Sequence, residues 1–474
     1  MAASARAGIK TEGDDVALLL APAGSGAAAV FTTNQVKAAP VLVSAGHLAK
    51  GRARAIIVNA GNANCCTGAR GLENARQMAT LAAQKLEISP EEVLVCSTGI
   101  IGHQLPLEKI ENALQTLQIA AGEAAVGVEN SLDGREISAE KTEVSGNEPE
   151  TSVEEAIVEV EADATNANSA EEVVADETEI PGAESEITEA ESEVPPEKVT
   201  FDAGAAVDEK VARAFMTTDT VPKFCAASLE IGGKVVTVGG QAKGVGMIGP
   251  NMAPLSSPAA WHATLLAFLT TDAQIERGLL QNLLERAVSR SFNSVTVDGD
   301  MSTNDTAILL ASGASGAQIT AQNAPLFSGL LDAVCIELGK KIARDGEGAT
   351  KLIEIRVKGA RRERDAKVIA LTIANSPLVK TAIFGKDPNW GRIAMAAGRA
   401  GVEFDAQNLS FSLGDVEMFR SGEPVDFDLK SAEAVLEGEE VQIALDLGEG
   451  SASWTAWTCD FSYDYVKINA EYHT

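Results

Sequence analysis

The feature that most limits how this chain can fold is an acidic segment of about seventy residues that contains no aromatic side chain. Residues 131–200 hold 22 Asp and Glu side chains but only three basic ones, Arg135, Lys141 and Lys198. Such a segment cannot bury enough apolar surface to offset the entropy lost when it is ordered. We therefore expect a solvated, disordered insertion at about 130–200, with the folded part built from both flanks. The alternative is an acidic segment that binds a partner.

The charge outside this segment argues against nucleic acid as a partner. The 474-residue chain has a formal net charge of −30, of which −19 lies in residues 131–200. No basic patch remains that could neutralise phosphates, so we expect no nucleic-acid binding. No apolar run reaches the roughly 18–20 residues that span a bilayer, so we expect no membrane segment and a cytoplasmic protein. An acid-free start with Arg6 and Lys10 leaves a very short transit peptide as the alternative.

Short apolar runs alternate with longer amphipathic stretches, which predicts the α/β class. The expected strands are Val16–Leu20, Ala27–Phe31, Ala55–Val58, Val93–Cys96, Val235–Val238, Leu352–Val357, Val368–Ile373 and Val441–Asp446. The expected helices are Leu72–Leu86, Lys210–Met216, Asp272–Phe292 and Leu326–Ala343.

The cysteine and histidine pattern points away from metal and disulfide chemistry. Six cysteines form no Cys-x-x-Cys pair, and the adjacent Cys65 and Cys66 are poorly placed for a structural disulfide. The four histidines are scattered, so they give no two-histidine zinc spacing and no support for a Ser-His-Asp triad. We expect reduced thiols and no metal.

Two motifs resemble ligand loops but fail the physical test for them. Gly244–Gly249 matches Gly-x-Gly-x-x-Gly, yet Pro250 follows at once, whereas a dinucleotide site needs that turn to open a helix. Asp298–Asn304 begins like a calcium loop, but the places that require Gly and Glu hold Thr303 and Leu309. We interpret the first as a close backbone passage and the second as a polar turn that shapes a pocket wall.

A nucleophile that needs no histidine suits this composition. A threonine at a chain terminus is one such device, because its own α-amine can act as the base. The reference pKa of an α-amine is about 7.7–8.0, so much of it is close to deprotonation at neutral pH. The device requires a break in the chain just before the threonine.

Ten short segments supply a specific family resemblance. They are Phe31–Pro40, Val58–Asn64, Ser97–Gly102, Met216–Thr220, Lys243–Ala253, Thr264–Asp272, Ser291–Asp300, Asp345–Thr350, Phe384–Arg392 and Asn469–Thr474. In this order and over roughly 400 residues, the chain resembles the glutamate N-acetyltransferases, also called ornithine acetyltransferases, of arginine biosynthesis.

The resemblance implies a fold and a processing event. The implied fold is a layered α/β sandwich of the N-terminal-nucleophile-like type, with inner sheets and outer helices. The family cuts its own backbone at an Ala-Thr bond, which here matches Ala263-Thr264. The implied pieces are residues 1–263 and 264–474, which stay associated, and a heterotetramer of two α and two β pieces is expected.

The resemblance also implies the chemistry of the site. The hydroxyl of Thr264 would take an acetyl group from N-acetylornithine and pass it to glutamate. Thr98 and the backbone N–H of Gly99 match the oxyanion hole. The implied substrate-binding residues are Thr217, Lys243, Thr264, Glu347, Asn469 and Thr474, with Lys243 suited to a carboxylate and Glu347 to an ammonium. No resident cofactor is implied, and acetyl-CoA is left open as a further co-substrate.

The sequence departs from the family pattern next to the nucleophile. Ten residues, 254–263, lie between Ala253 and Thr264, where the family has none. Self-cleavage needs a positioned backbone at that bond, so an unprocessed, inactive homologue or scaffold is one alternative. The other is an N-terminal-nucleophile aminopeptidase, which would pass the acyl group to water.

Overall fold

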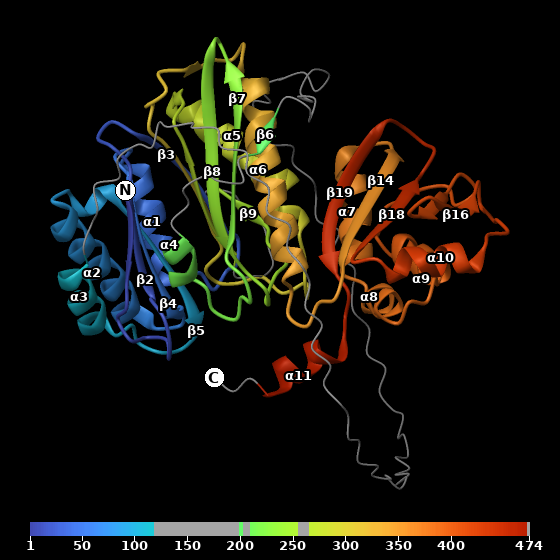
Figure 1. Ribbon diagram of the computed structural model, residues 1–474, viewed down its shortest axis with the longest axis horizontal. Coiled ribbons are helices and arrows are strands. Elements are labelled where there is room, and N and C mark those ends of the chain that lie inside the picture. The colour runs from blue at the N-terminus through green and yellow to red at the C-terminus, as the bar shows by residue number, and fades with distance from the viewer. Residues whose placement is uncertain (118–198, 202–208, 255–264, 472–474) are drawn as a thin grey trace, which may run out of the picture. The chain divides into compact units, whose positions relative to one another are not determined.

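The computed structural model describes residues 1–117, 199–201, 209–254 and 265–471, which belong to one structural unit. Nearly all of the expected acidic insertion lies outside these residues, as do Ala263, Thr264 and Thr474. In the described part, strands and helices alternate along the chain and form three main sheets, so the expected α/β class is confirmed (Figure 1).

The first sheet has the strand order β1-β2-β4-β5. Its strands are β1 (Ala2–Ala5), β2 (Val16–Leu20), β4 (Ala55–Asn62) and β5 (Val93–Ile100). The neighbouring helices are α1 (Ala39–Ala49), α2 (Gly68–Leu86) and α3 (Leu107–Thr116), with the short 3₁₀ helix η1 (Pro90–Glu92) before β5. β4 and β5 run parallel and are almost continuously buried, as expected of strands that are covered on both faces.

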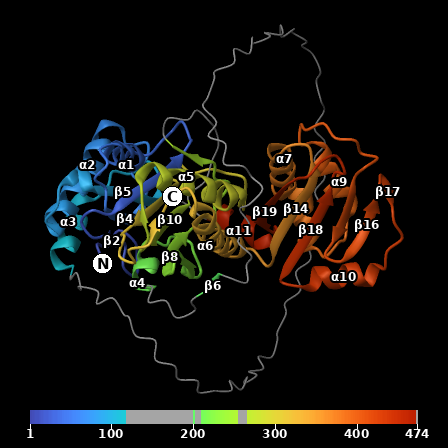
Figure 2. The same ribbon diagram turned by 90° about the horizontal axis from the view of Figure 1, so that it is seen from above.

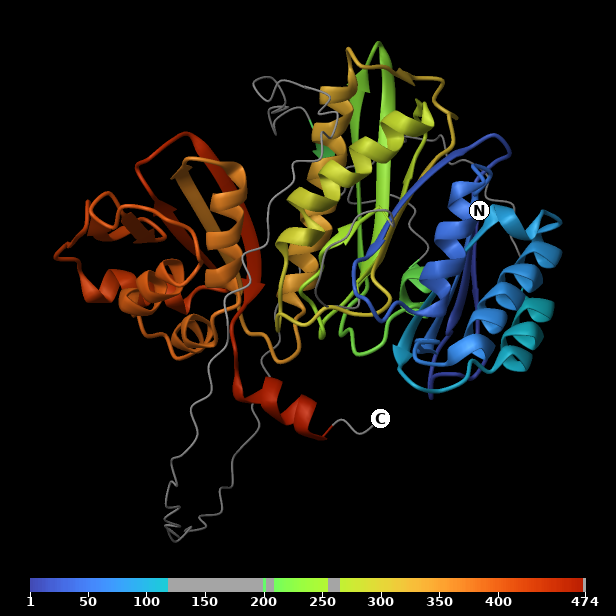
Figure 3. The same ribbon diagram turned by 180° about the vertical axis from the view of Figure 1, so that it is seen from behind.

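The second sheet has the order β6-β7-β8-β10-β12-β3-β9. Its strands are β3 (Gly26–Thr32), β6 (Thr200–Phe201), β7 (Lys223–Ile231), β8 (Lys234–Lys243), β9 (Met252–Ala253), β10 (Leu266–Thr271) and β12 (Thr306–Ala311). Helices α5 (Arg277–Arg290) and α6 (Ala324–Arg344) lie across one face of this sheet (Figure 3). Helix α4 (Glu209–Ala214) precedes β7.

The first two sheets pack face to face and enclose a shared core. Ile56 and Leu94 of the first sheet belong to the same buried cluster as Phe31, Phe268 and Ile308 of the second. Helices α1–α3 and helices α5–α6 cover the outer faces, as the view from above shows (Figure 2). The expected layered α/β sandwich, with inner sheets and outer helices, is confirmed.

The third sheet has the order β17-β16-β15-β18-β14-β19 and its own core. Its strands are β14 (Leu352–Ala360), β15 (Ser410–Leu413), β16 (Val416–Arg420), β17 (Glu423–Pro424), β18 (Glu440–Asp446) and β19 (Ala452–Cys459). Its helices are α7 (Glu363–Ala374), α8 (Pro377–Phe384), α9 (Trp390–Gly398) and α10 (Leu429–Glu437). The remaining described elements are β11 (Gln274–Ile275), β13 (Gln318–Ile319), η4 (Phe292–Ser294) and α11 (Tyr463–Glu471).

Within the described residues, no single helix is long and apolar enough to cross a membrane. The bent pair α7 and α8 meets the requirement by length and composition alone. All six cysteines are free thiols in the structure.

One expected strand is wrong. Val368–Ile373 lies within helix α7, not in a sheet. The fully buried residues of this helix include Ala366, Ile369, Ala370 and Ile373, which recur at helical spacing and face the third core. The run of β-branched residues was misleading because its periodicity, extended back to Ala366, is that of a helix.

One helix begins later than the sequence predicts. The predicted helix Asp272–Phe292 begins at Arg277 as α5, because the carboxylate of Glu276 caps it by accepting from Gly278 N and Leu279 N. Asp272 instead accepts from the backbone N–H of Thr237 at 2.9 Å. The other expected strands and helices are confirmed, with shifted ends.

Replacing Ile369 by Ala tests the helical face of α7. The side chain of Ile369 is fully buried, so the substitution is expected to lower the free energy of unfolding by about 2–5 kcal/mol. The exposed neighbour Arg364 is the control, and Arg364→Ala is expected to change the free energy by less than about 0.5 kcal/mol. Urea unfolding measures both, and equal effects would contradict the assignment.

Candidate active site

Three predicted site residues meet around one lysine ammonium. Lys243 ends β8, Thr98 lies in β5, and Thr217 lies in the loop between α4 and β7. Lys243 Nζ donates to Thr217 Oγ1 at 2.9 Å and to Thr98 Oγ1 at 3.2 Å. Both Lys243 and Thr98 are buried. Because β5 belongs to the first sheet and β8 to the second, this site lies where the two inner sheets meet.

Gly99 stands where the backbone admits no side chain. Its φ is +128°, and a Cβ at this position would lie 2.3 Å from the carbonyl carbon of Gly61 in β4. The parallel pairing of β4 and β5 places these two glycines opposite each other. The close approach holds the Gly99 backbone against β4, directly after Thr98 in the chain.

Opposing charges surround the ammonium of Lys243. Burial lowers the pKa of Lys243, whereas Asp219 raises it, and Lys223 lowers it further. Burial also acts on Asp219 and favours its neutral form, but Lys243 and Lys223 outweigh burial and hold the pKa of Asp219 below its ordinary value. Asp219 therefore stays charged and supports a charged Lys243.

Glu347 and Asn469, also predicted, lie together nearby. Glu347 follows α6, and its N–H donates to the carbonyl of Val245 at 2.9 Å. Its two carboxylate oxygens accept from Thr218 Oγ1 at 3.1 Å and from Asn469 Nδ2, on α11, at 3.0 Å. Since Thr218 is next to Thr217, Glu347 lies one loop residue away from the lysine cluster.

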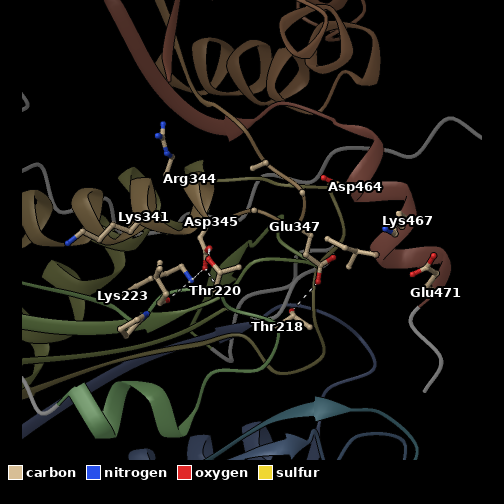
Figure 4. A pocket seen from close by; sticks show the side chains of 16 residues that line it. Thr218, Thr220, Lys223, Lys341, Arg344, Asp345, Glu347, Asp464, Lys467 and Glu471 are labelled. Atoms are coloured by element: carbon tan, nitrogen blue, oxygen red, sulfur yellow. Dashed lines mark hydrogen bonds and ion pairs between the residues drawn. The ribbon is translucent and has the colours of Figure 1, made fainter. Parts of the chain in front are cut away.

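A cavity of about 770 Å³ opens beside Glu347 (Figure 4). Both acidic and basic side chains line it, among them Asp345, Glu347, Lys341, Arg344 and Lys467. Its volume falls within the range of roughly 300–1,000 Å³ of small-molecule sites. The mixed charges suit a ligand that carries both an ammonium and a carboxylate.

The chain enters this region again at Leu265, the residue after Thr264. The N–H of Leu265 donates to Asp305 Oδ1, and Leu266 pairs with Lys243 across β10 and β8. Asp305 is fully buried, and burial raises its pKa well above the ordinary value. Its second oxygen has no hydrogen-bond partner among the described residues.

The two rejected motifs turn out to pack against each other. No helix begins at Gly244–Gly249, since the next described element is the strand β9. Gly249 packs against the backbone of Gly299 too closely for a Cβ. Asp298 accepts from Met247 N at 2.6 Å and from Ile248 N at 2.8 Å. The interpretation as a close backbone passage is confirmed.

Four charged residues of the site were missed by sequence reasoning. Asp219, Lys223, Asp345 and Asp305 are buried or nearly so. Asp219 and Asp305 bond to predicted site residues or their neighbours, and Lys223 joins Asp219 to Asp345. Two of them, Asp219 and Asp345, lie inside segments that carry the family resemblance, but that resemblance does not distinguish them from the other residues of those segments. Among the described residues, no group of three or more His, Cys, Asp or Glu could hold a metal ion.

Comparison with known proteins gives matches over the whole length. The ArgJ family model matches residues 1–134 and 138–474. The arginine biosynthesis bifunctional protein ArgJ of Symbiobacterium thermophilum is 41% identical over 480 residues, which cover 100% of this chain and 96% of the relative. The protein of the same name from Synechocystis sp. is 41% identical over 487 residues, with the same coverage of 100% and 96%.

Two crystal structures are also similar. The arginine biosynthesis bifunctional protein argJ of Bacillus halodurans is 42% identical, covers 43% of this chain and 97% of its own, and has a TM-score of 0.42. An ornithine acetyltransferase of Mycobacterium tuberculosis complexed with ornithine is 28% identical, covers 53% and 91%, and has a TM-score of 0.30.

Full-length identity of this level, on an α/β sandwich with a clustered threonine–lysine site, defines the chain as an acyltransferase. It belongs to the ArgJ family.

Replacing Gly99 by Ala tests the close approach of β4 and β5. The new Cβ would overlap Gly61 and Asn62, so the variant is expected to lose more than the roughly 1–3 kcal/mol of strain that a positive φ alone costs. The matched control is Gly102→Ala, because Gly102 has a φ of +89° but no atom within 4 Å of the new Cβ. Urea unfolding compares the two, and equal losses would contradict the steric account.

Proposed function

We propose that this chain transfers an acetyl group from N-acetylornithine to glutamate through an acetyl ester on Thr264. The observation that carries the proposal is the cluster of Lys243, Thr98 and Thr217 beside β10, the strand that begins two residues after Thr264. The names of the ArgJ relatives and of the ornithine-bound relative support the same substrates.

In this proposal Thr264 becomes an N-terminal residue and its α-amine accepts the proton of its own hydroxyl. The hydroxyl oxygen attacks the acetyl carbonyl, the amide C–N bond breaks, and ornithine leaves with the proton. The amine of glutamate then attacks the ester carbonyl, so N-acetylglutamate leaves and the Thr264 hydroxyl is restored. No external base is needed, in keeping with the absence of a histidine from the cluster formed by Thr98, Thr217 and Lys243.

Thr98 and Gly99 are proposed to stabilise the tetrahedral oxyanion of both steps. The hydroxyl of Thr98 and the N–H of Gly99 are adjacent donors on one rigid strand, and the close contact of Gly99 with Gly61 restricts their movement. Loss of one such donor typically raises the barrier by about 3–4 kcal/mol.

The remaining predicted residues are proposed to bind substrate. The ammonium of Lys243 and the hydroxyl of Thr217 suit the substrate carboxylate, and Glu347 with Asn469 suits the ammonium. Thr474, outside the described residues, is assigned the same role only by the family resemblance.

Self-cleavage at Ala263-Thr264 is proposed to create the nucleophile. The Thr264 hydroxyl attacks the carbonyl of Ala263, the amide nitrogen takes the proton, and water then hydrolyses the resulting ester. The pieces 1–263 and 264–474 would stay associated, because the β10 strand of the second piece is hydrogen-bonded to β8 of the first. In addition, β12 of the second piece pairs with β3 of the first.

The proposal also covers the oligomeric state of the protein and the acetyl donors that it uses. We infer a heterotetramer of two α and two β pieces in the cytoplasm, with no resident cofactor. The relatives' description as bifunctional supports acetyl-CoA as a second acetyl donor to glutamate. An assay that supplies acetyl-CoA in place of N-acetylornithine separates a bifunctional enzyme from a monofunctional one.

Replacing Thr264 by Ala tests the nucleophile. The unaltered 49.2 kDa chain is expected to yield two pieces on a denaturing gel, the smaller beginning at Thr264, whereas Thr264→Ala stays whole and transfers no acetyl group. Intact mass spectrometry identifies the cut.

The matched control for this experiment is Ser256→Ala, which removes another hydroxyl close to the junction and is expected to be cut normally. A single uncut wild-type species, or acetyl transfer by Thr264→Ala, would refute the proposal. Release of acetate without glutamate, at the rate of transfer, would instead indicate a hydrolase.

Replacing Glu347 by Gln tests recognition of the substrate ammonium. A hydrogen bond to a charged group contributes about 1.5–3 kcal/mol, so kcat/KM for N-acetylornithine is expected to fall about 10- to 100-fold. Glu363→Gln, on α7 in the third sheet's helical layer, is the control and is expected to leave kcat/KM unchanged. Equal kinetics for the two variants would exclude Glu347 from the site.

A further inference from the structure

The carboxylate of Asp219 binds two backbone segments that meet at Lys243, and its side chain is completely buried. Oδ2 accepts from the backbone N–H of Thr217 at 3.0 Å, and Oδ1 accepts from the backbone N–H of Gly244 at 2.8 Å. Gly244 directly follows Lys243. One carboxylate therefore fixes the two backbone segments that carry the hydroxyl of Thr217 and the ammonium of Lys243.

The same carboxylate continues into a buried chain of charges. Lys223 Nζ, also completely buried, donates to Asp219 Oδ1 at 2.7 Å and to Asp345 Oδ2 at 2.5 Å. Asp345 in turn accepts from the N–H of Thr220 at 3.1 Å (Figure 4). Since Asp345 lies two residues before Glu347, this chain connects the lysine end of the site to the carboxylate end.

The charged groups that face Lys243 are Asp219, Lys223, Asp305 and Glu347. Asp305 also raises the pKa of Lys243, but less than Asp219 does, and burial raises the pKa of Asp305 itself well above its ordinary value. Glu347 lies by the cavity and is bonded to Thr218 and Asn469. Asp219 is therefore the carboxylate that most opposes the lowering of the Lys243 pKa by burial and by Lys223.

We propose that Asp219 is a positioning residue of this site, which orients Thr217 and Lys243 toward the substrate carboxylate. The inference rests on the proposed function for the identity of the substrate. The electrostatic interaction between Asp219 and Lys243 does not depend on the substrate, and it can be measured without any reaction.

The test is Asp219→Asn in the full chain, because the amide keeps the shape and removes the charge. KM for N-acetylornithine is expected to rise at least about tenfold with a smaller change in kcat, since binding of the carboxylate is lost in both the ground and transition states. The pKa of Lys243 falls further without Asp219, so the alkaline limb of kcat/KM is expected to move to lower pH. Unchanged KM and alkaline limb, or a loss confined to kcat, would overturn the proposal.

The matched control is Asp332→Asn, which also removes a buried carboxyl from the second sheet's helical layer. Asp332 pairs with Arg286 and lies on α6, about 20 Å before Asp345 at 1.5 Å per residue. It is expected to leave KM and the pH profile unchanged. An equal effect of both substitutions would mean that general destabilisation is responsible.

A second variant guards against failure to fold. Asp219→Asn combined with Lys223→Met removes the buried cation together with the carboxylate that it faces, while Asp345 keeps its hydrogen bonds from Thr220. The rise in KM is expected to persist, with a smaller shift in the alkaline limb because the repulsion from Lys223 is also gone. A wild-type KM in this variant would overturn the proposal.

A double-mutant cycle separates this inference from the proposed function. Urea unfolding of Asp219→Asn, Lys243→Met and the double variant is expected to give non-additive free energies, whichever acyl group the enzyme transfers. Additive effects would refute the pairing of Asp219 with Lys243. Absence of acetyl transfer in the unaltered protein, with non-additivity preserved, would refute the proposed function alone.

Discussion

Two lysine ammonium groups lie buried near one edge of the second sheet, and the geometry around them depends on the carboxylate that they face in common. Removing an ammonium from water costs several kcal/mol, which an excellent arrangement of opposite charge must offset. Asp219 supplies that charge to Lys223 and Lys243, and its oxygens also accept two backbone N–H groups. The loops that approach the site are thus ordered by an electrostatic requirement as well as by apolar packing.

The apolar layers explain why such a site can exist at all. The facing sheets exclude water from Lys243 and Thr98, so each hydrogen bond there acts in a medium of low dielectric. Glu347, in contrast, lines a cavity and meets polar side chains from the Thr217–Thr220 loop and from α11. The site therefore has a dry end and an open end, which suits a reaction whose acyl carbon must avoid water while its substrates exchange.

The sequence was most informative where a pattern is local. Val16–Leu20 and Val93–Cys96 were predicted as strands because short apolar runs bounded by turns are typical of buried strands, and both are strands. Val368–Ile373 failed because a short apolar run does not separate a strand from a buried helix. The start of α5 failed because Asp272 bonds to Thr237, a contact across the sheet that no local signal reports.

The candidate site shows the same contrast between what a local sequence pattern reveals and what depends on distant contacts. The resemblance selected Thr98, Thr217, Lys243, Glu347 and Asn469, and the structure brings them together in two adjoining groups. Their roles still rest on the proposal. Asp219 and Asp305 could not be singled out, because what distinguishes them is complete burial of a carboxyl, which depends on segments far apart in the sequence.

The position of β10 in its sheet has a consequence for the order of folding and processing. This strand lies between β8, which precedes the proposed cut, and β12, which follows it. A strand in that position acquires its neighbours only when the sheet has formed, so the proposed cut would follow folding. After a cut, refolding from the unfolded state would require two separate polypeptides to meet, which makes it dependent on concentration. Cleavage would then be irreversible in practice. The intact chain could fold as a single polypeptide, whereas the processed form would depend on a slow rate of unfolding.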